Sequence, residues 1–491
     1  RNILRLSRGR GLPRFYSSRC SHCLCRPWAS HAHKMLGLAG ARAAAARAAT
    51  ASVSRKPTPF VQFPRLLGVG REPIGATLRH KSATCLSAGA ASPAGSVVAG
   101  GGIASKAGGG FLARARLLFT AEGGLVRPGY ETIVGAWLLG TSGMLYTMIA
   151  IGGYTRLSGS GLSMTDWRIQ GRRLPISQEA WEKEFEEYKR YPEYQRLHAG
   201  TMELDEFKKI YFVEWFHRMW GRTVGVLFAG PLAYFAARRI LRPALVVRLS
   251  GLFALGISQA FVGWWMVRSG FDPPEKHTPT LGAHQRPRVS PYRLASHWTA
   301  ALTLYVGTTW TALSLLRPSP ALIHKSAEAI SAASRLRRFA FPAAGLVGLT
   351  LLSGPFVAGN DAGRAYNTWP KMLDDWVPPE WLAAVAAPLR CWRTFFEDTA
   401  VVQFDHRCLA YASVFATLGL SAYATCLPLA PAAAAAVRAL PIAVFAQMSL
   451  GIATLMLYVP IELGVAHQAG GVAVLTALLV VLHNLRIPVK L

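Results

Sequence analysis

Val213-Glu-Trp-Phe-His-Arg218 returns in the second half of the chain as Val402-Gln-Phe-Asp-His-Arg407. In both phrases the histidine begins an apolar segment of the length that crosses a bilayer core of roughly 30 Å. Two further histidines, His297 and His467, begin apolar segments in the same way. An ionisable side chain at the edge of a membrane helix is costly to place and usually has a function. The repeated phrase therefore predicts a duplicated membrane protein with functional histidines.

The composition agrees with a membrane protein. With 51% hydrophobic residues and a mean hydropathy of +0.25 over 491 residues, the chain is too apolar for an ordinary soluble protein of this size. The apolar residues gather in stretches of membrane-spanning length, which predicts an all-α membrane protein. Eight transmembrane helices are expected, at about 132–152, 217–236, 246–266, 294–315, 338–358, 405–427, 436–458 and 464–485.

The eight segments divide into two sets of four that match in order. Besides the His-Arg phrase, Gln259–Gly263 and Gln447–Gly451 share the spacing Q-x-x-x-G, and the first segment of each set ends in a Gly-rich stretch. Matches in the same order indicate an internal duplication. We expect two tandem, repeat-related four-helix bundles, an N-terminal one in residues 121–325 with a long loop between its first two spans and a C-terminal one in residues 326–491.

The residues before the first span have a different composition. Residues 1–120 contain 19 Lys and Arg and one acidic residue, Glu72, and so carry +18 of the formal charge of +29. A segment that is basic, almost free of acid and rich in Ala, Ser and Gly is typical of a mitochondrial transit peptide followed by a flexible linker, although a basic tail that stays attached has the same composition. Basic residues interleaved with aromatic ones are missing here, which argues against nucleic-acid binding.

Basic residues in the shorter connections indicate the orientation. The connections between spans 2 and 3 and between spans 4 and 5, and the residues after span 8, are rich in Arg and Lys and lie on the same side as the leader. The positive-inside rule places this side in the matrix. We therefore expect a multi-pass protein of the mitochondrial inner membrane with both termini in the matrix.

The four histidines are candidate ligands of haem iron. They all begin even-numbered spans, which run in one direction, so the four imidazoles are expected at similar depth. Within each bundle two histidines come from alternate helices, and two neutral imidazoles can bind one iron axially. A lone histidine at this depth is more often structural, but four at repeat-related positions favour ligation. The expected pairs are His217 with His297 and His406 with His467.

Arginines near the histidines are candidates for binding haem propionates. A guanidinium forms charge-assisted hydrogen bonds with carboxylates, although basic side chains near span ends also extend to the interface without any ligand. The candidates are Arg218, Arg407, Arg156 and Arg364.

The two bundles differ at one position beside the histidines. Glu214 precedes His217 by three residues, on the same helix face, whereas Gln403 holds the matching position before His406. A carboxylate at that place could deliver protons. The difference predicts one reactive haem and one electron-holding haem. Alternatively, Glu214 caps the start of its helix, where a negative charge suits the helix dipole.

From about Tyr130 to Arg486 the sequence resembles the haem A synthase family. The phrases that carry this resemblance cover both predicted bundles and the loops between spans. They are Gly153–Trp167, Glu214–Arg218, Gly263–Gly270, Val289–His297, Ala358–Pro370 and Val402–Arg407.

The resemblance implies an oxidoreductase that converts the C8 methyl group of haem O into the formyl group of haem A by successive oxygen-dependent hydroxylations. It implies that His406 and His467 ligate a resident haem b, that His217 and His297 face the substrate haem, and that Glu214 lies nearest the reaction. The sequence has no motif for NADPH, flavin or an iron–sulfur cluster, so electrons are expected from a partner such as a ferredoxin. A homo-oligomer and contacts with the haem O synthase and with oxidase assembly factors stay open.

Other functions fit parts of the pattern. A two-haem b-type electron-transfer cytochrome would need the same histidines but would not depend on Glu214. A transporter built from parallel repeats would place polar or broken helices near mid-membrane, whereas here the conspicuous polar groups lie at one edge. A structural assembly factor for the oxidase is compatible with the sequence.

Overall fold

The computed structural model of the chain describes residues 124–164, 166–271, 289–317, 320–388 and 392–487. Within these ranges the secondary structure is helical apart from two isolated β-bridges. This confirms the predicted all-α class. The predicted transit peptide and linker, residues 1–120, lie outside the described residues.

Long helices account for both halves of the described chain, with short helices in the loops between them. The N-terminal half contains α3 (Glu131–Leu157), α4 (Gln178–Lys189), the π-helix η1 (Tyr194–His198), α5 (Leu204–Ala237), α6 (Pro243–Arg268), the 3₁₀ turn η2 (Ser269–Phe271) and α7 (Pro291–Leu316). The C-terminal half contains α8 (Pro320–Ile323), α9 (Ala327–Gly359), η4 (Ala362–Arg364), α10 (Pro379–Ala386), α11 (Thr394–Glu397), α12 (Thr399–Thr425), α13 (Pro431–Arg438), α14 (Leu440–Met456) and α15 (Ile461–Asn484).

The helices begin where the sequence offers suitable starting residues. Proline occupies the first turn of α6, α7, α13 and α14, where its missing N–H leaves no hydrogen bond unmade. The side chain of Ser326 accepts from the backbone N–H of Ala329 at the start of α9, and Asp398 accepts from two backbone N–H groups at the start of α12. These prolines and capping side chains determine where these six helices begin.

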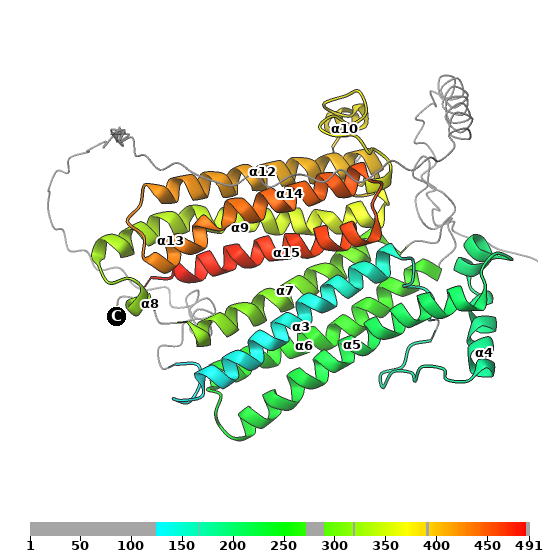
Figure 1. Ribbon diagram of the computed structural model, residues 1–491, viewed down its shortest axis with the longest axis horizontal. Coiled ribbons are helices and arrows are strands. Elements are labelled where there is room, and N and C mark those ends of the chain that lie inside the picture. The colour runs from blue at the N-terminus through cyan, green and yellow to red at the C-terminus, as the bar shows by residue number, and fades with distance from the viewer. Residues whose placement is uncertain (1–123, 165, 272–288, 318–319, 389–391, 488–491) are drawn as a thin grey trace, which may run out of the picture. The chain divides into compact units, whose positions relative to one another are not determined.

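Two groups of four long helices pack side by side (Figure 1). In the N-terminal half, α3 contacts α5 and α7, and α6 contacts α5 and α7. In the C-terminal half, α9 contacts α12 and α15, and α14 contacts α12 and α15. Each group is thus a closed ring of neighbours built from corresponding elements. This packing suits the predicted pair of four-helix bundles, and their origin by duplication stays a prediction.

The two groups meet along a seam formed by α3 and α7 on one side and α9 and α15 on the other. One buried core runs across it and includes Leu145 and Leu302 from the first half with Leu336 and Leu478 from the second. Polar side chains also cross it. Tyr305 Oη lies 2.7 Å from Thr476 Oγ1, Gln468 donates to the Ile149 carbonyl at 2.8 Å, and Tyr146 donates to the Ala469 carbonyl at 3.0 Å.

Seven helices of the described residues are long and apolar enough to cross a membrane. Many of their apolar side chains point outward, as expected of surfaces that face lipid. The sequence predicted eight spans, and the difference is α5, which contains the expected span 217–236. Arg218 and Arg222 with the polar residues around them dilute its apolar stretch. The packing of α5 against α3 and α6 agrees with a place for it as the eighth span. That place stays a prediction.

The long loop between α3 and α5 is folded. Its short helix α4 packs against the first turns of α5, and aromatic rings fill the space between them, with Phe207 stacked on Phe185 at 5.0 Å and on Tyr188 at 5.1 Å between centroids. We call this group the loop cluster; its buried members are Met164, Phe185, Tyr188, Phe207 and Tyr211.

Candidate haem-binding site

One large cavity contains the residues that the sequence singled out. Its volume is about 1890 Å³, well above the roughly 300–1,000 Å³ of a pocket for one drug-sized ligand. It extends through both groups of helices, so a single continuous space serves both predicted sites. All seven predicted site residues line it, namely Glu214, His217, His297, His406, His467, Arg218 and Arg407.

Each histidine lies on one of the expected helices. His297 is the seventh residue of α7 and His467 the seventh of α15, so the two hold equivalent places. His406 lies two turns into α12. His217 differs, because α5 begins at Leu204, more than three turns earlier. The sequence predicted that His217 begins an apolar segment, and the charged residues before that segment continue the helix out to the loop cluster.

The histidine pair of the C-terminal half has the spacing that one metal ion requires. The ring centroids of His406 and His467 are 6.4 Å apart and their planes are inclined by 82°. Two imidazoles on opposite sides of one metal ion, each bound through a bond of about 2 Å, have centroids about 6 Å apart. Within the described part of the chain, His217 and His297 make no comparable ring contact. Both pairs line the cavity, but the C-terminal pair already has the separation for shared ligation.

Glycines on neighbouring helices make room for the rings. A Cβ atom at Gly263 would lie 3.2 Å from Cε1 of His297, and one at Gly451 would lie 2.7 Å from Cε1 of His467. Four residues before each glycine, a glutamine reaches the same histidine: Gln259 Nε2 donates to the His297 carbonyl at 3.3 Å, and Gln447 Nε2 donates to the His467 carbonyl at 2.8 Å.

The sequence revealed these glutamines and glycines only as the repeated spacing Q-x-x-x-G. In the structure, that spacing places one amide and one bare backbone position against the same histidine. Ser353, whose Oγ lies 2.6 Å from Nδ1 of His406, had no such signal. Its contact joins two helices far apart in the sequence.

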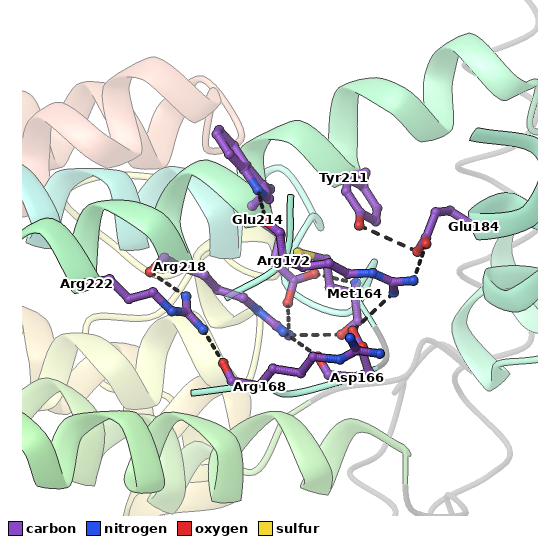
Figure 2. A network of polar contacts seen from close by, with 10 residues as sticks. Met164, Asp166, Arg168, Arg172, Glu184, Tyr211, Glu214, Arg218 and Arg222 are labelled. Atoms are coloured by element: carbon purple, nitrogen blue, oxygen red, sulfur yellow. Dashed lines mark hydrogen bonds and ion pairs between the residues drawn. The ribbon is translucent and has the colours of Figure 1, made fainter. Parts of the chain in front are cut away.

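Glu214 lies at the centre of a polar network that joins α5 to the loop (Figure 2). It is 2% exposed. Its Oε2 accepts from Ser163 Oγ and from the backbone N–H of Met164, both at 2.7 Å, and its Oε1 accepts from Arg218 at 2.6 Å. Because α5 begins ten residues before it, at Leu204, the alternative that Glu214 caps the start of its helix is wrong.

Arg218 completes this network. Its guanidinium donates to the carbonyls of Met164 and Asp166, and so fastens the segment after α3 to α5. Farther out, Arg172 pairs with both Asp166 and Glu184 (Figure 2). The carboxylate beside His217 therefore has a structural task in addition to facing the cavity.

The C-terminal half repeats this arrangement with an amide in place of the carboxylate. Gln403 donates to the Ala362 carbonyl at 2.7 Å and accepts from Arg407 at 2.8 Å. Arg407 in turn donates to the carbonyls of Tyr366 and Thr368. Glu214–Arg218 and Gln403–Arg407 are thus matching clamps, each of which fixes the segment that follows the first helix of its half.

The four arginines predicted to bind propionates differ in how many of their donors are already bonded to the protein. The guanidinium groups of Arg218 and Arg407 already donate to protein carbonyls. Arg156 donates to the Ala358 carbonyl and pairs with Asp361 across the seam. Arg364 is exposed, lines the cavity and makes no side-chain hydrogen bond or ion pair with the described residues. Of the four candidates, Arg364 has the most donors to offer a carboxylate.

The fold and the site together describe a helical membrane protein in which two pairs of histidines line one cavity, an arrangement that would suit haem held between helices. The chain belongs to the family of cytochrome oxidase assembly proteins whose model, COX15-CtaA, matches residues 135–479. Relatives share its sequence over most of their length. The protein named "Heme A synthase COX15" in Arabidopsis thaliana is 46% identical over 74% of this chain and 76% of its own. Its namesake in Homo sapiens is 43% identical over 72% and 83%, and "Heme A synthase" of Rhodospirillum centenum is 43% identical over 72% and 89%.

Proposed function

We propose that this protein is a haem A synthase, an oxidoreductase that converts haem O into haem A for cytochrome oxidase. The observation that carries the proposal is the single cavity lined by two histidine pairs, in a chain whose relatives are named for this activity. The reaction turns the C8 methyl group of haem O into a formyl group. Each of its two hydroxylations consumes one O₂, two electrons and two protons and releases one water, and the resulting geminal diol loses water.

The C-terminal bundle, residues 326–491, would hold a resident haem b between His406 and His467. The fit is supported by the 6.4 Å separation of their rings. A haem b in this place supplies one-electron transfer. Arg364 and Arg407 are the arginines of the C-terminal half that line the cavity among the described residues, and they are the candidates for binding its propionates.

The N-terminal bundle, residues 121–325, would receive haem O between His217 and His297. Glu214 lies one turn before His217 and lines the same cavity. We assign it the role of holding or passing a proton at its carboxylate oxygens during hydroxylation. Its hydrogen bonds with Ser163 and Arg218 orient the carboxylate for this task.

The direct test is to express the full chain in membranes of cells that make haem O but lack haem A, and to separate the extracted pigments by chromatography. Haem A is expected with the unmodified protein, and only haem O with His297→Ala. A protein that reaches the membrane and carries its haem b but yields no haem A would contradict the proposal.

We further propose that the protein resides in the mitochondrial inner membrane with both termini in the matrix. The basic composition of residues 1–120 and of the connections between α5 and α6 and between α7 and α9 supports this orientation. Protease added to mitoplasts should cleave the loop between α3 and α5 and spare a tag at the C-terminus. A tag that is cleaved while that loop survives would reverse the orientation.

Electrons would come from a soluble donor of the ferredoxin type, because the sequence has no motif for NADPH, flavin or an iron–sulfur cluster. Contacts with the haem O synthase and with oxidase assembly factors, and a homo-oligomer, fit a membrane enzyme that must collect an apolar substrate and deliver an apolar product. Reduction of the bound haem b by a reduced ferredoxin, followed by its absorbance, tests the proposed donor.

A further inference from the structure

The two histidines of the C-terminal half are both held at the ring nitrogen Nδ1. Ser353 Oγ lies 2.6 Å from Nδ1 of His406. Gln447 Nε2 lies 3.0 Å from Nδ1 of His467 and also donates to the carbonyl of the same residue. Each ring is therefore fixed in rotation by a side chain from the neighbouring helix. The amide of Gln447 can only donate to Nδ1 of His467, which leaves the proton of that ring on Nε2, so its contact fixes the orientation of the ring and not the form that binds iron.

The contact of Ser353 can also set which nitrogen of His406 carries the proton. The Ser353 hydroxyl lies within hydrogen-bonding distance of a second acceptor, the Thr350 carbonyl, at 2.8 Å. A hydroxyl has one hydrogen to give, so when it donates to Thr350 its oxygen accepts from Nδ1–H of His406. The lone pair of Nε2 is then free, which is the form of imidazole that binds a metal ion when the other nitrogen donates to an acceptor.

The N-terminal half lacks these anchors. A Cβ atom at Gly152 would contact the ring of His217, as one at Gly354 would contact His406, so the two glycines correspond. The residue before Gly354 is Ser353, but the residue before Gly152 is Ile151, whose side chain has no hydrogen-bonding group.

The second histidine of the N-terminal half differs in the same way. Gln259 reaches the carbonyl of His297 rather than its ring. Nδ1 of His297 is buried and has no hydrogen-bond partner among the described residues.

We infer that this difference in anchoring makes the C-terminal site retain its haem and the N-terminal site exchange it. An imidazole that is already oriented loses little freedom on binding iron, whereas an unanchored imidazole can turn away and release it. A substrate site must release haem A after every reaction cycle, while a resident electron carrier must stay. The inference rests on the proposed assignment of haem b to the C-terminal half and of haem O to the N-terminal half.

The test measures how fast haem b leaves the full-length protein in detergent when excess apomyoglobin is present as the acceptor. Ser353→Ala should lose haem b about 10-fold faster or more, the usual size of an effect on ligand support. Ser353→Thr keeps the hydroxyl and should restore slow loss. Ser421→Ala removes a hydroxyl that donates to Thr417 in the same bundle, away from the histidines, and should behave like the unmodified protein.

A second readout separates ligand support from general loosening of the fold. An acceptor on Nδ1–H makes the imidazole a stronger donor to iron and stabilises the ferric form, so Ser353→Ala should raise the midpoint potential of haem b. The reciprocal change, Ile151→Ser, should slow the release of haem A. If Ser353→Ala leaves both the rate of haem b loss and the potential unchanged, the inference is wrong.

One further variant keeps that failure apart from a failure of the proposed function. His406→Ala should abolish haem b binding altogether. If it does so while Ser353→Ala has no effect, the haem assignment survives and the anchoring inference falls. If His406→Ala protein still binds haem b with an unchanged spectrum, the haem assignment itself falls.

Discussion

Glu214 combines a place in the wall of the cavity with a structural task that the sequence did not predict. It lines the cavity one turn from His217, and it accepts hydrogen bonds from Ser163, Met164 and Arg218. Removing one partner of a buried ion pair costs about 3–5 kcal/mol because the other charge is left without compensation. A variant that deletes the side chain therefore tests both tasks at once, and an isosteric variant is needed to separate them.

We predict that Glu214→Gln keeps haem b but lowers haem A formation about 100-fold or more, the usual contribution of a positioned acid or base. Glutamine fills the matching place, Gln403, in the other half and still accepts from an arginine there, so the clamp should survive. Haem A and haem b are measured by chromatography and by absorbance of the same membranes. Glu186→Gln, which alters an exposed carboxylate paired with Lys189, is the control. Normal haem A output from Glu214→Gln would favour the two-haem electron-transfer cytochrome.

Glu193 is another carboxyl at the cavity, and the sequence did not single it out. It is 5% exposed, and Tyr188 donates to it at 3.2 Å. Burial raises the pKa of Glu193 from 4.5 to about 8; the charge of Glu214 acts in the same direction, while the Tyr188 hydrogen bond and the charge of Arg156 oppose it. The loop between α3 and α5 thus contains a carboxyl group whose pKa lies above neutral pH.

The raised pKa of Glu193 predicts how stability depends on pH. Between pH 4.5 and about 8 the folded protein holds this proton and the unfolded chain does not, so stability falls as the pH rises through that range. Glu193→Gln, which is neutral at every pH, should show a smaller decrease in melting temperature between pH 5 and pH 8. Glu179→Gln, in the first turn of α4, should keep the full decrease. Equal slopes for all three proteins would mean that Glu193 is ionised in the fold.

At the scale of the helix, the Q-x-x-x-G pattern places a glutamine and a glycine one turn apart on the face that meets the next histidine. The pattern recurs on α6 and α14, and in both places the glycine lies against an imidazole. The sequence could therefore predict that the pattern is duplicated, but not what it touches. Contacts between side chains on different helices depend on how each helix is rotated, and the apolar composition of a membrane helix leaves that rotation open.

We predict that Gly451→Ala removes haem b from the C-terminal site, because the new methyl group would lie 2.7 Å from the His467 ring and push it aside. The haem b content per protein is measured by absorbance of the reduced pigment. Gly419→Ala on α12 is the matched control, since nothing lies within 4 Å of its Cβ position. That control should keep its haem and gain about 0.5–1 kcal/mol of stability from the better helix former. Full haem b content in Gly451→Ala would place the His467 ring elsewhere.

The ends of several helices could not be predicted from the sequence. The expected span 436–458 is divided into α13 and α14, which meet at Ala439 ahead of Pro441. The expected long loop between the first two spans contains α4, η1 and the first turns of α5. Hydropathy identifies stretches that lipid can surround, so it misses charged helices that aromatic packing stabilises.

At the scale of the whole molecule, the two halves share a core and cannot be treated as independent domains. Leu145 and Leu478 belong to one buried cluster, although they come from opposite halves. The sequence could predict two bundles from the repeated motifs. It could not predict that their histidines open on one cavity, because that depends on which helices form the seam.

We predict that Tyr305→Phe, in the N-terminal half, lowers the temperature at which haem b is lost from the C-terminal half. The change removes the hydrogen bond with Thr476 across the seam, which should cost about 0.5–1.5 kcal/mol. The melting curve is followed by haem b absorbance and by circular dichroism, and the two should coincide. Thr303→Val, which removes an exposed hydroxyl that donates within α7, should change neither. Two separate transitions would mean that the halves unfold independently.

Helix α5 is continuous from Phe207 in the loop cluster to His217 beside the cavity, with its internal proline only later, at Pro231. One end of α5 is held by the aromatic packing of the loop cluster, and His217 lies farther along the same helix. A tilt of the helix at the loop cluster therefore also moves His217. Shortening or unfolding the loop between α3 and α5 would therefore shift the imidazole of His217. A change in the loop cluster can in this way move a residue of the candidate site without replacing it.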